Sequence, residues 1–363
     1  MQQAARRGAI KHASLRRAYA PLMRKVRAVL AAIGIAAILL ASATSARAQS
    51  VEDFYRGKTL RMLIGYGPGG GYDIYARLVA QFLPRHLPGH PTIVPQNMAG
   101  AGSLLAARYV YNAAPKDGTV LASLAQTLAL DSLTVPNAGI DVAKMPYVGR
   151  VATNIDLGVA LVKSGLKSFD DVRARQYSVG ASGGGSTTVL FPSALAAYAG
   201  AKFRLVRGYS GTSEILLAVE RGEVDIVGAY GLPGILVSHP DWLHGGEAVF
   251  LYQAALKRDR LLPNVPTLPE LALNDEGRLV LRAAASTAEI GRSIITSPGV
   301  PQDRLAALRA AFRAMLDDPG FLAECAKRQA MVAGAGGEEM DALVRETLQL
   351  SPAILDKIGQ MMR

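Results

Sequence analysis

The chain has 363 residues, 50% of them hydrophobic, so it can bury at least one sizeable core and, at roughly 100 to 200 residues per domain, two. This composition excludes intrinsic disorder and fibrous repeats. The net charge of +11 suggests an anionic partner such as nucleic acid. However, nine basic and no acidic residues precede Gln49, which leaves 31 basic against 29 acidic residues in the remainder. The body is therefore nearly neutral, and we expect no nucleic-acid partner.

The first 48 residues have the pattern of a secretory signal peptide. A basic stretch at 24–27 precedes an apolar run at 29–40 and the sequence Ala46-Arg47-Ala48, which fits the A-x-A cleavage pattern. The apolar run is about a dozen residues long, short of the roughly 20 that span hydrocarbon. We therefore expect a signal peptide over 1–48, with Met23 as its better-placed start, and cleavage after Ala48.

The only cysteine, Cys325, can form no intrachain disulfide and has no second thiol for a metal or redox pair. It lies among apolar residues of an expected helix, which predicts a buried, inert thiol. An export signal without disulfides indicates the bacterial periplasm. The histidines show no zinc spacing, and we expect neither metal nor cofactor.

The first half of the mature chain alternates apolar runs with helical patterns. Strands are predicted at 60–64, 92–95 and 120–124, with helices at 74–82 and 103–112 between them. This βαβαβ order predicts a parallel sheet covered by helices.

A second α/β series follows the loop at 136–146. Its predicted strands are 157–162, 177–181, 203–206, 224–227 and 248–252, and its helices are 187–199 and 212–221. The proline-rich segment 263–269 is expected to be an extended return crossing. A strand at 293–296 and a helix at 301–317 complete the pattern. We predict two α/β lobes, each a mostly parallel sheet flanked by helices, formed by 49–154 with 254–363 and by 155–253. A ligand cleft lies between the lobes.

The segment 65–73, GYGPGGGYD, connects the first predicted strand to the first helix. It satisfies G-x-G-x-x-G, but the second strand ends without the acidic residue that would bind a ribose, so we reject a dinucleotide site. Consecutive glycines leave backbone N–H groups open at a helix N-terminus, which attracts a carboxylate or similar anion. A tight turn that needs positive φ is the alternative explanation.

This turn is one of several motifs spread along the chain. They are FYRGKT at 54–59, PGGGYD at 68–73, NMAGAG at 97–102, APKDGT at 114–119, SGGGS at 182–186, GEVD at 222–225 and PNVPTLPE at 263–270. In this combination the chain resembles the substrate-binding receptors of tripartite tricarboxylate transporters, the Bug family. The resemblance implies a two-lobed, type II-like periplasmic binding protein, monomeric, that captures a small organic carboxylate for membrane permease subunits.

The resemblance also implies the ligand contacts. The first-lobe residues are Gly70, Gly71, Tyr72, Ala99, Gly100, Ala101, Gly102 and Ser123, and those of the second lobe are Ser182, Ser186, Tyr209 and Asp225. Ser182 and Ser186 also suit a helix start, where a hydroxyl can serve as a cap.

The chain departs from the family pattern around the expected ligand. Tyr72 replaces a small or threonine-like residue, the stretch 186–188 contains no histidine after Ser186, and the second lobe reads RGYSG at 207–211. Arg207 is either a clamp for a second carboxylate or a solvated charge. Tyr66 and Tyr72 either form an aromatic wall for the ligand or pack on their own lobe.

Two other function classes remain open from the sequence. A receptor that signals to a membrane sensor kinase would use the same binding chemistry. The second class is a periplasmic hydrolase. The segment 208–211, GYSG, approaches the nucleophile elbow of such enzymes but lacks its G-x-S-x-G spacing. We expect a receptor and no enzyme.

Overall fold

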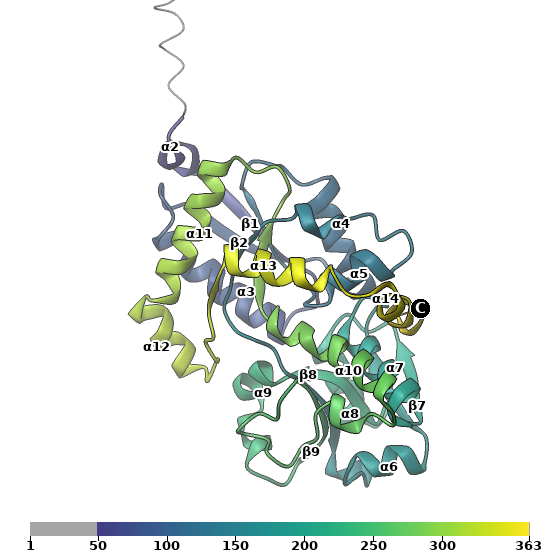
Figure 1. Cartoon of the computed structure of the whole chain (residues 1–363). Coiled ribbons are helices and arrows are strands. Elements are labelled where there is room, and N and C mark those ends of the chain that lie inside the picture. Colours follow the sequence, from purple (N-terminus) through teal and green to yellow (C-terminus); the bar gives the residue numbers. More distant parts are fainter. Residues whose placement is uncertain (1–48, 363) are drawn as a thin grey trace, which may run out of the picture. The chain divides into compact units, whose positions relative to one another are not determined.

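The computed structural model describes residues 49–362, and the folded unit begins at Val51. The predicted signal peptide lies outside the described residues. The helices are α2 Val51–Tyr55, α3 Gly71–Phe82, α4 Leu104–Asn112, α5 Leu128–Thr134, α6 Phe169–Ala174, α7 Thr187–Ala199, α8 Thr212–Arg221, α9 Leu232–Ser238, α10 Asp275–Ser286, α11 Gln302–Leu316, α12 Pro319–Lys327, α13 Gly337–Thr347 and α14 Pro352–Met361 (Figure 1). The described part contains no helix long and apolar enough to cross a membrane.

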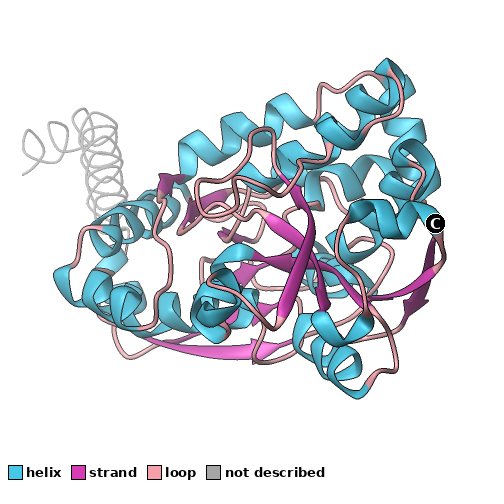
Figure 2. Cartoon of the chain, turned by 90° about the horizontal axis from the view of Figure 1, so that it is seen from below, coloured by secondary structure: helices cyan, strands magenta, loops and turns pink. Residues whose placement is uncertain are grey.

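The strands are β1 Thr59–Ile64, β2 Thr92–Asn97, β3 Val120–Ser123, β4 Tyr147–Arg150, β5 Asp156–Leu161, β6 Tyr177–Ala181, β7 Phe203–Arg207, β8 Ile226–Gly231, β9 Ala248–Ala254, β10 Ser293–Thr296 and β11 Ala335–Gly336. They form two sheets, ordered β11-β4-β10-β3-β1-β2 and β7-β6-β8-β5-β9. Helices cover the strands on both sides (Figure 2). The predicted α/β fold with two sheets is confirmed.

Each sheet is mixed rather than mostly parallel. The strands joined by crossover helices pair in parallel, as β1 does with β2 and β3, and β6 with β7 and β8. The remaining strands, β4, β10 and β11 in one sheet and β5 and β9 in the other, pair antiparallel. The reversed strands are β10 and β11 in the first sheet and β5 in the second, whereas β4 and β9 run in the same direction as β3 and β8. Both β5 and β10 follow a strand of the other sheet, so no βαβ crossover imposes the parallel direction on them.

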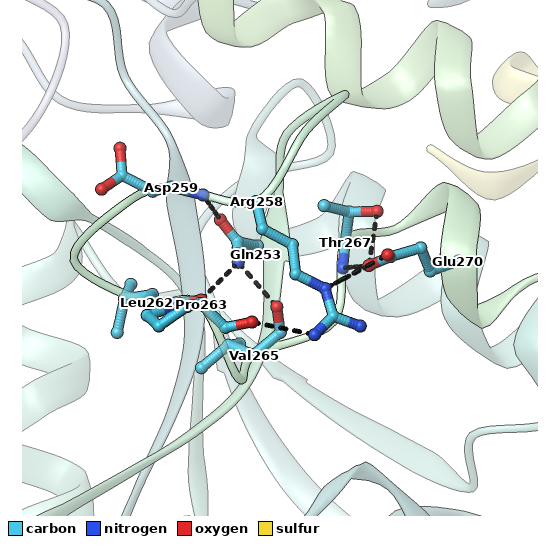
Figure 3. Close-up of polar contacts among 8 residues, drawn as sticks. All are labelled: Gln253, Arg258, Asp259, Leu262, Pro263, Val265, Thr267 and Glu270. Atoms are coloured by element: carbon cyan, nitrogen blue, oxygen red, sulfur yellow. Dashed lines mark hydrogen bonds and ion pairs between the residues drawn. The ribbon is translucent and has the colours of Figure 1, made fainter.

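The proline-rich segment does not form the expected return crossing. Thr267 bridges to Gln253 at the end of β9, and the Gln253 amide donates to the carbonyls of Leu262 (3.1 Å) and Val265 (2.6 Å). Glu270 accepts from the Thr267 N–H (2.7 Å) and binds Arg258 (Figure 3). Proline removes backbone donors here, so side chains add to the two backbone hydrogen bonds, Gln253 N–H to Pro266 (2.9 Å) and Leu268 N–H to Gln253 (3.0 Å), that hold the segment against the second sheet.

Two later helices also pack on the second sheet. Leu281 of α10 and Ile358 of α14 are fully buried in one cluster with Leu190 of α7 and Val179 of β6. The chain thus reaches the first sheet again only after α10, at β10. The lobe boundaries stay a prediction, and we propose that the second lobe includes α10.

Candidate functional site

The turn between β1 and α3 is fixed by hydrogen bonds from its own and neighbouring elements. Gly69 has φ of +83°, and its N–H donates to Asp73 (3.0 Å). Burial opposes ionisation of Asp73, but hydrogen bonds from Arg77, Gly69 and Asn97 lower its pKa. Positive φ is confined to Gly69 in this turn, because Gly70 at the N-cap has φ of −82° and Gly71 also lies outside the left-handed region. Backbone strain therefore does not explain the glycines at 70 and 71.

Gly71 instead makes room for a buried arginine. A Cβ on Gly71 would lie 3.1 Å from Nη2 of Arg292, and a Cβ on Gly231 would lie 2.3 Å from the same atom. Arg292 precedes β10, where its backbone pairs with Ala152 (2.8 Å) on the segment that leads from one sheet to the other. The guanidinium thus lies between the N-terminus of α3 and the end of β8.

Arg292 is only 4% exposed, yet its Nε and Nη1 have no hydrogen-bond partner among the described residues. Its guanidinium carbon lies 3.9 Å from the centre of the Tyr72 ring, a cation–π contact. Buried polar groups are normally hydrogen-bonded, and an unpaired buried charge is costly. Nε and Nη1 are therefore donors that an anionic ligand could satisfy.

These residues enclose a small space, the inner cavity, of about 20 Å³. It is lined from the first sheet's side by Tyr66, Gly67, Gly70, Gly71, Tyr72 and Arg292, and from the second by Asp156, Ser182, Ser186, Thr187, Thr188, Gly211, Thr212, Ala229, Tyr230 and Gly231. Gly70, Gly71, Tyr72, Ser182 and Ser186 are thereby brought together as the sequence analysis expected.

A buried polar network lies beside the inner cavity. The Asn154 amide donates to Gln126 (2.7 Å) and to Asp156 (2.9 Å), and the Gln126 amide contacts Asp156 at 3.3 Å. Burial raises the pKa of Asp156, while Arg292 acts in the opposite direction. Tyr72 joins the same region because its hydroxyl accepts from the Gln126 N–H (2.9 Å), and burial raises its pKa to about 12.

In the turn at 182–186, the serine hydroxyls hydrogen-bond to Thr188 rather than cap α7. Ser186 is the N-cap of α7 but makes no side-chain cap bond; its Oγ lies 2.6 Å from Thr188 Oγ1. Ser182 Oγ lies 3.1 Å from the same Thr188 atom. This hydroxyl cluster offers donors and acceptors to the inner cavity.

A second space, the outer cavity, has a volume of about 250 Å³. Its wall contains the run 100–103, in which every residue has positive φ, including the non-glycine residues Ala101 (+47°) and Ser103 (+82°). Such strain is concentrated at functional sites. The turn also touches the second lobe, since a Cβ on Gly183 would lie 2.1 Å from the Gly102 nitrogen. The residues lining the outer cavity are Gly65, Tyr66, Ala99, Gly100, Ala101, Gly102, Ser103, Ser182, Gly183, Gly208, Tyr209 and Ser210.

Three predicted contacts lie elsewhere. Among the described residues that line the two cavities, Ser123, Arg207 and Asp225 are missing. Ser123 is buried at the end of β3. Arg207 is exposed, and Asp225 precedes β8, where its carboxylate accepts from Ser178 N–H (2.8 Å) and Oγ–H (2.7 Å). Asp225 therefore joins β6 to β8 at the strand ends opposite Gly231.

Sequence reasoning missed Arg292, Asp156 and Thr188. Arg292 stands alone before a short apolar strand, and no spacing or motif marks it. Its place beside the inner cavity follows from the burial of its side chain between Gly71 and Gly231, which lie far apart in sequence. No group of three His, Cys, Asp or Glu side chains able to hold a metal occurs among residues 49–362.

Comparisons with known proteins agree with the resemblance. The model of the tripartite tricarboxylate transporter family receptor matches residues 75–360. A UPF0065 protein of Cupriavidus necator, encoded in the gbd 5' region, is 27% identical, with 92% of this chain and 98% of the relative covered. A UPF0065 protein of Bordetella pertussis is 25% identical over 88% and 94%.

Solved structures share the fold. The periplasmic binding protein BugD has a TM-score of 0.67 at 19% identity, covering 85% of this chain and 98% of its own. MatC from Rhodopseudomonas palustris, solved with bound malate, has a TM-score of 0.63 at 21% identity, with 83% and 99% covered. An R. palustris protein solved with adipate has a TM-score of 0.65 at 22% identity, with 84% and 97% covered.

The matched family consists of receptors rather than enzymes, and its model covers most of the chain, including the second sheet and every strand of the first sheet except β1. This protein therefore belongs to the tripartite tricarboxylate transporter receptor family.

Proposed function

We propose that this chain is a periplasmic receptor that binds a small organic carboxylate through Arg292 and releases it to a tripartite-type membrane transporter. Family membership supports the receptor role. The observation that carries the choice of ligand is the buried Arg292 guanidinium, whose Nε and Nη1 lack partners among the described residues.

A carboxylate fits this site because its two oxygens can accept hydrogen bonds from the guanidinium. Arginine binds carboxylates through two parallel N–H···O bonds, made by Nη2 together with either Nε or Nη1. Each of the two donors without a partner can therefore form such a pair only with Nη2. The N-terminus of α3, a helix of 12 residues, lies against the same guanidinium through Gly71 and adds the positive end of a helix dipole. Relatives by fold have been solved with malate and adipate, which supports the same ligand class here.

The decisive experiment is calorimetric titration after a thermal-shift screen of mono- and dicarboxylates. A carboxylate at about 100 times its Kd is expected to add roughly 2.7 kcal/mol to the free energy of unfolding. Arg292→Gln should weaken binding by about 30-fold or more, since removing one partner of a buried charge pair costs about 2 kcal/mol or more.

Arg150→Gln is the matched control, because Arg150 is a second buried arginine that lines neither cavity. Its substitution should leave the affinity unchanged. Full affinity in folded Arg292→Gln, or no stabilisation by any carboxylate, would remove this proposal.

The periplasmic location rests on the predicted signal peptide. Mass spectrometry of the exported protein should find Gln49 as the N-terminus, because Ala46-Arg47-Ala48 fits the signal-peptidase pattern. A retained apolar run at 29–40 would contradict a freely diffusing receptor.

A gene deletion in cells distinguishes a transport role from a signalling role. Deletion of the gene should abolish uptake of the calorimetrically identified acid, and wild-type but not Arg292→Gln protein should restore it. Unchanged uptake together with a lost transcriptional response would instead indicate a partner for a sensor kinase.

A further inference from the structure

Tyr66 lies at the boundary between the two cavities and lines both of them. Its ring stacks on Tyr72, with the ring centres 4.6 Å apart and an interplanar angle of 23°. Arg292 lies over Tyr72 at 3.9 Å. Because a guanidinium and a second ring cannot share one face at these distances, Tyr72 is sandwiched between Arg292 and Tyr66.

The inner cavity is too small for the body of a ligand. Its volume of about 20 Å³ accommodates about one water molecule. The outer cavity offers about 250 Å³ but contains no Arg292 side chain in its wall. A carboxylate with a carbon body therefore reaches the guanidinium only when the two spaces join.

Tyr72 and Tyr66 differ in how firmly their side chains are held. The Tyr72 hydroxyl accepts from the Gln126 N–H at 2.9 Å, and its ring is packed under Arg292. The Tyr66 hydroxyl has one long contact, at 3.5 Å to the Gly102 carbonyl. Of the two rings, Tyr66 is the one that can rotate at low cost.

The Tyr66 backbone, in contrast, is fixed. Its carbonyl accepts from the Asn97 amide (2.9 Å), while the N–H groups of the neighbours Gly65 and Gly67 donate to Ser123 (3.0 Å) and Ser210 (3.1 Å). Opening therefore requires a change of side-chain rotamer, with no movement of the glycine turn.

The outer cavity indicates what the far end of the ligand carries. Its lining residues are Gly, Ala and Ser together with Tyr66 and Tyr209, and none of those in the described chain is Lys, Arg or His. A second carboxylate there would lack a counter-ion, whereas an uncharged hydrogen-bonding group would find partners.

We propose that Tyr66 is a gate that determines ligand size, and that the preferred ligand is an elongated monocarboxylate with an uncharged, hydrogen-bonding distal end. The carboxylate binds Arg292, the Tyr66 ring swings away from Tyr72, and the body extends into the outer cavity. This inference rests on the proposed function and adds the specificity of the same site.

Calorimetry with 6-hydroxyhexanoate and adipate, two acids of equal chain length, tests the distal end. Wild-type protein should bind 6-hydroxyhexanoate at least about tenfold more tightly, because the second carboxylate of adipate must be desolvated without a counter-ion. Equal or tighter binding of adipate would overturn the assignment of the distal group.

Tyr66→Ala tests the gate with the same probes. Loss of the stacked ring removes an aromatic pair interaction that must be broken on opening, so affinity for 6-hydroxyhexanoate should rise about 2- to 10-fold, with a faster association rate. Tyr66→Phe keeps the ring and should behave as wild type. Tyr111→Ala, a tyrosine of α4 that lines neither cavity, controls for the loss of a tyrosine.

Unchanged affinity and association rate in Tyr66→Ala, with binding still dependent on Arg292, would overturn the gate and leave the carboxylate receptor intact. Absence of carboxylate binding in every variant would overturn both.

Discussion

Two arginines at the junction of the two sheets, Arg150 and Arg292, show how one kind of residue takes opposite roles. They are 8% and 4% exposed and lie on adjacent antiparallel segments, where Arg150 pairs with Ser293. Arg150 donates to the carbonyls of Ala333 (3.1 Å) and Glu289. Arg292 directs Nε and Nη1 at no partner among residues 49–362.

Burial alone therefore does not distinguish a guanidinium that is hydrogen-bonded within the protein from one whose donors are left without partners. Arg150 satisfies the carbonyls of segments that end near it, so its charge holds the first lobe together. Arg292 is surrounded by glycines, a ring and a carboxyl that leave its donors open. Satisfaction of hydrogen bonds, rather than exposure, separates the two roles.

The strongest effect is expected on stability at Arg150. Arg150→Gln should lower the free energy of unfolding by about 3 kcal/mol, because buried acceptors lose a charged donor. Arg292→Gln should change it by less than about 1 kcal/mol or raise it, since no protein hydrogen bond to Nε or Nη1 is lost. Urea denaturation measures both, and a larger loss in Arg292→Gln would reverse the comparison.

The next-largest effect on stability is expected at Gly231, where the absence of a Cβ leaves space for Arg292. Gly231→Ala would place a Cβ 2.1 Å from Asn154 Oδ1 and 2.3 Å from Arg292 Nη2, and such overpacking should cost about 2 kcal/mol. Denaturation should show part of this cost recovered in the double variant with Arg292→Ala. Gly70→Ala is the control for adding a methyl group, because its Cβ would have only Ser213 Oγ near it, at 3.8 Å. Gly222→Ala is unsuitable because Gly222 has positive φ. A stable Gly231→Ala protein would show that the guanidinium is not confined there.

A third variant gives Arg292 the internal partner that Arg150 already has. Gly71→Asp introduces a carboxylate beside Nη2, at the first residue of α3, where an acidic side chain also favours the helix dipole. Affinity for carboxylates should fall at least about tenfold, near 1.4 kcal/mol, while the new ion pair offsets the crowding of a Cβ 3.1 Å from Nη2. Gly71→Asn, of equal size and no charge, should weaken binding less; equal losses in the two variants would indicate steric obstruction alone.

The smallest effect is expected on the pH dependence of stability, through the buried carboxyl group of Asp131. Asp131 is fully buried, its Oδ1 has no partner among the described residues, and burial raises its pKa well above the usual value of 3.8. The folded state therefore holds this proton more tightly than the unfolded state does. Its stabilising contribution is complete below pH 3.8 and is lost as the pH rises through the folded pKa.

Asp131→Asn removes this titration. Its Tm should equal or fall below that of the wild type at pH 4 and exceed it at pH 8 by about 2 to 4 °C, which corresponds to roughly 1 kcal/mol in a protein of this size class. Asp170→Asn, at an exposed carboxylate of α6, provides the control. Parallel Tm profiles of Asp131→Asn and wild type would contradict a raised pKa.

Residue patterns alone determined most of the helices and strands. Helices α7 and α8 begin and end where their apolar spacing and the glycines that follow them predict. Strand β4, with Gly149 and Arg150 in four residues, and the two-residue β11 carry too little periodicity to be recognised. Local periodicity also does not predict strand direction, which depends on the path by which the chain re-enters a sheet.

The glycine turns at 70–71 and 182–186 were visible from the sequence because a strand-to-helix turn with exposed N–H groups is a local property. Arg292, in contrast, joins the site only through tertiary packing. Whether a guanidinium is satisfied depends on which carbonyls and side chains surround it after residues 71, 231 and 292 have come together. Local sequence sets which donors exist, and long-range packing sets which of them remain open to a ligand.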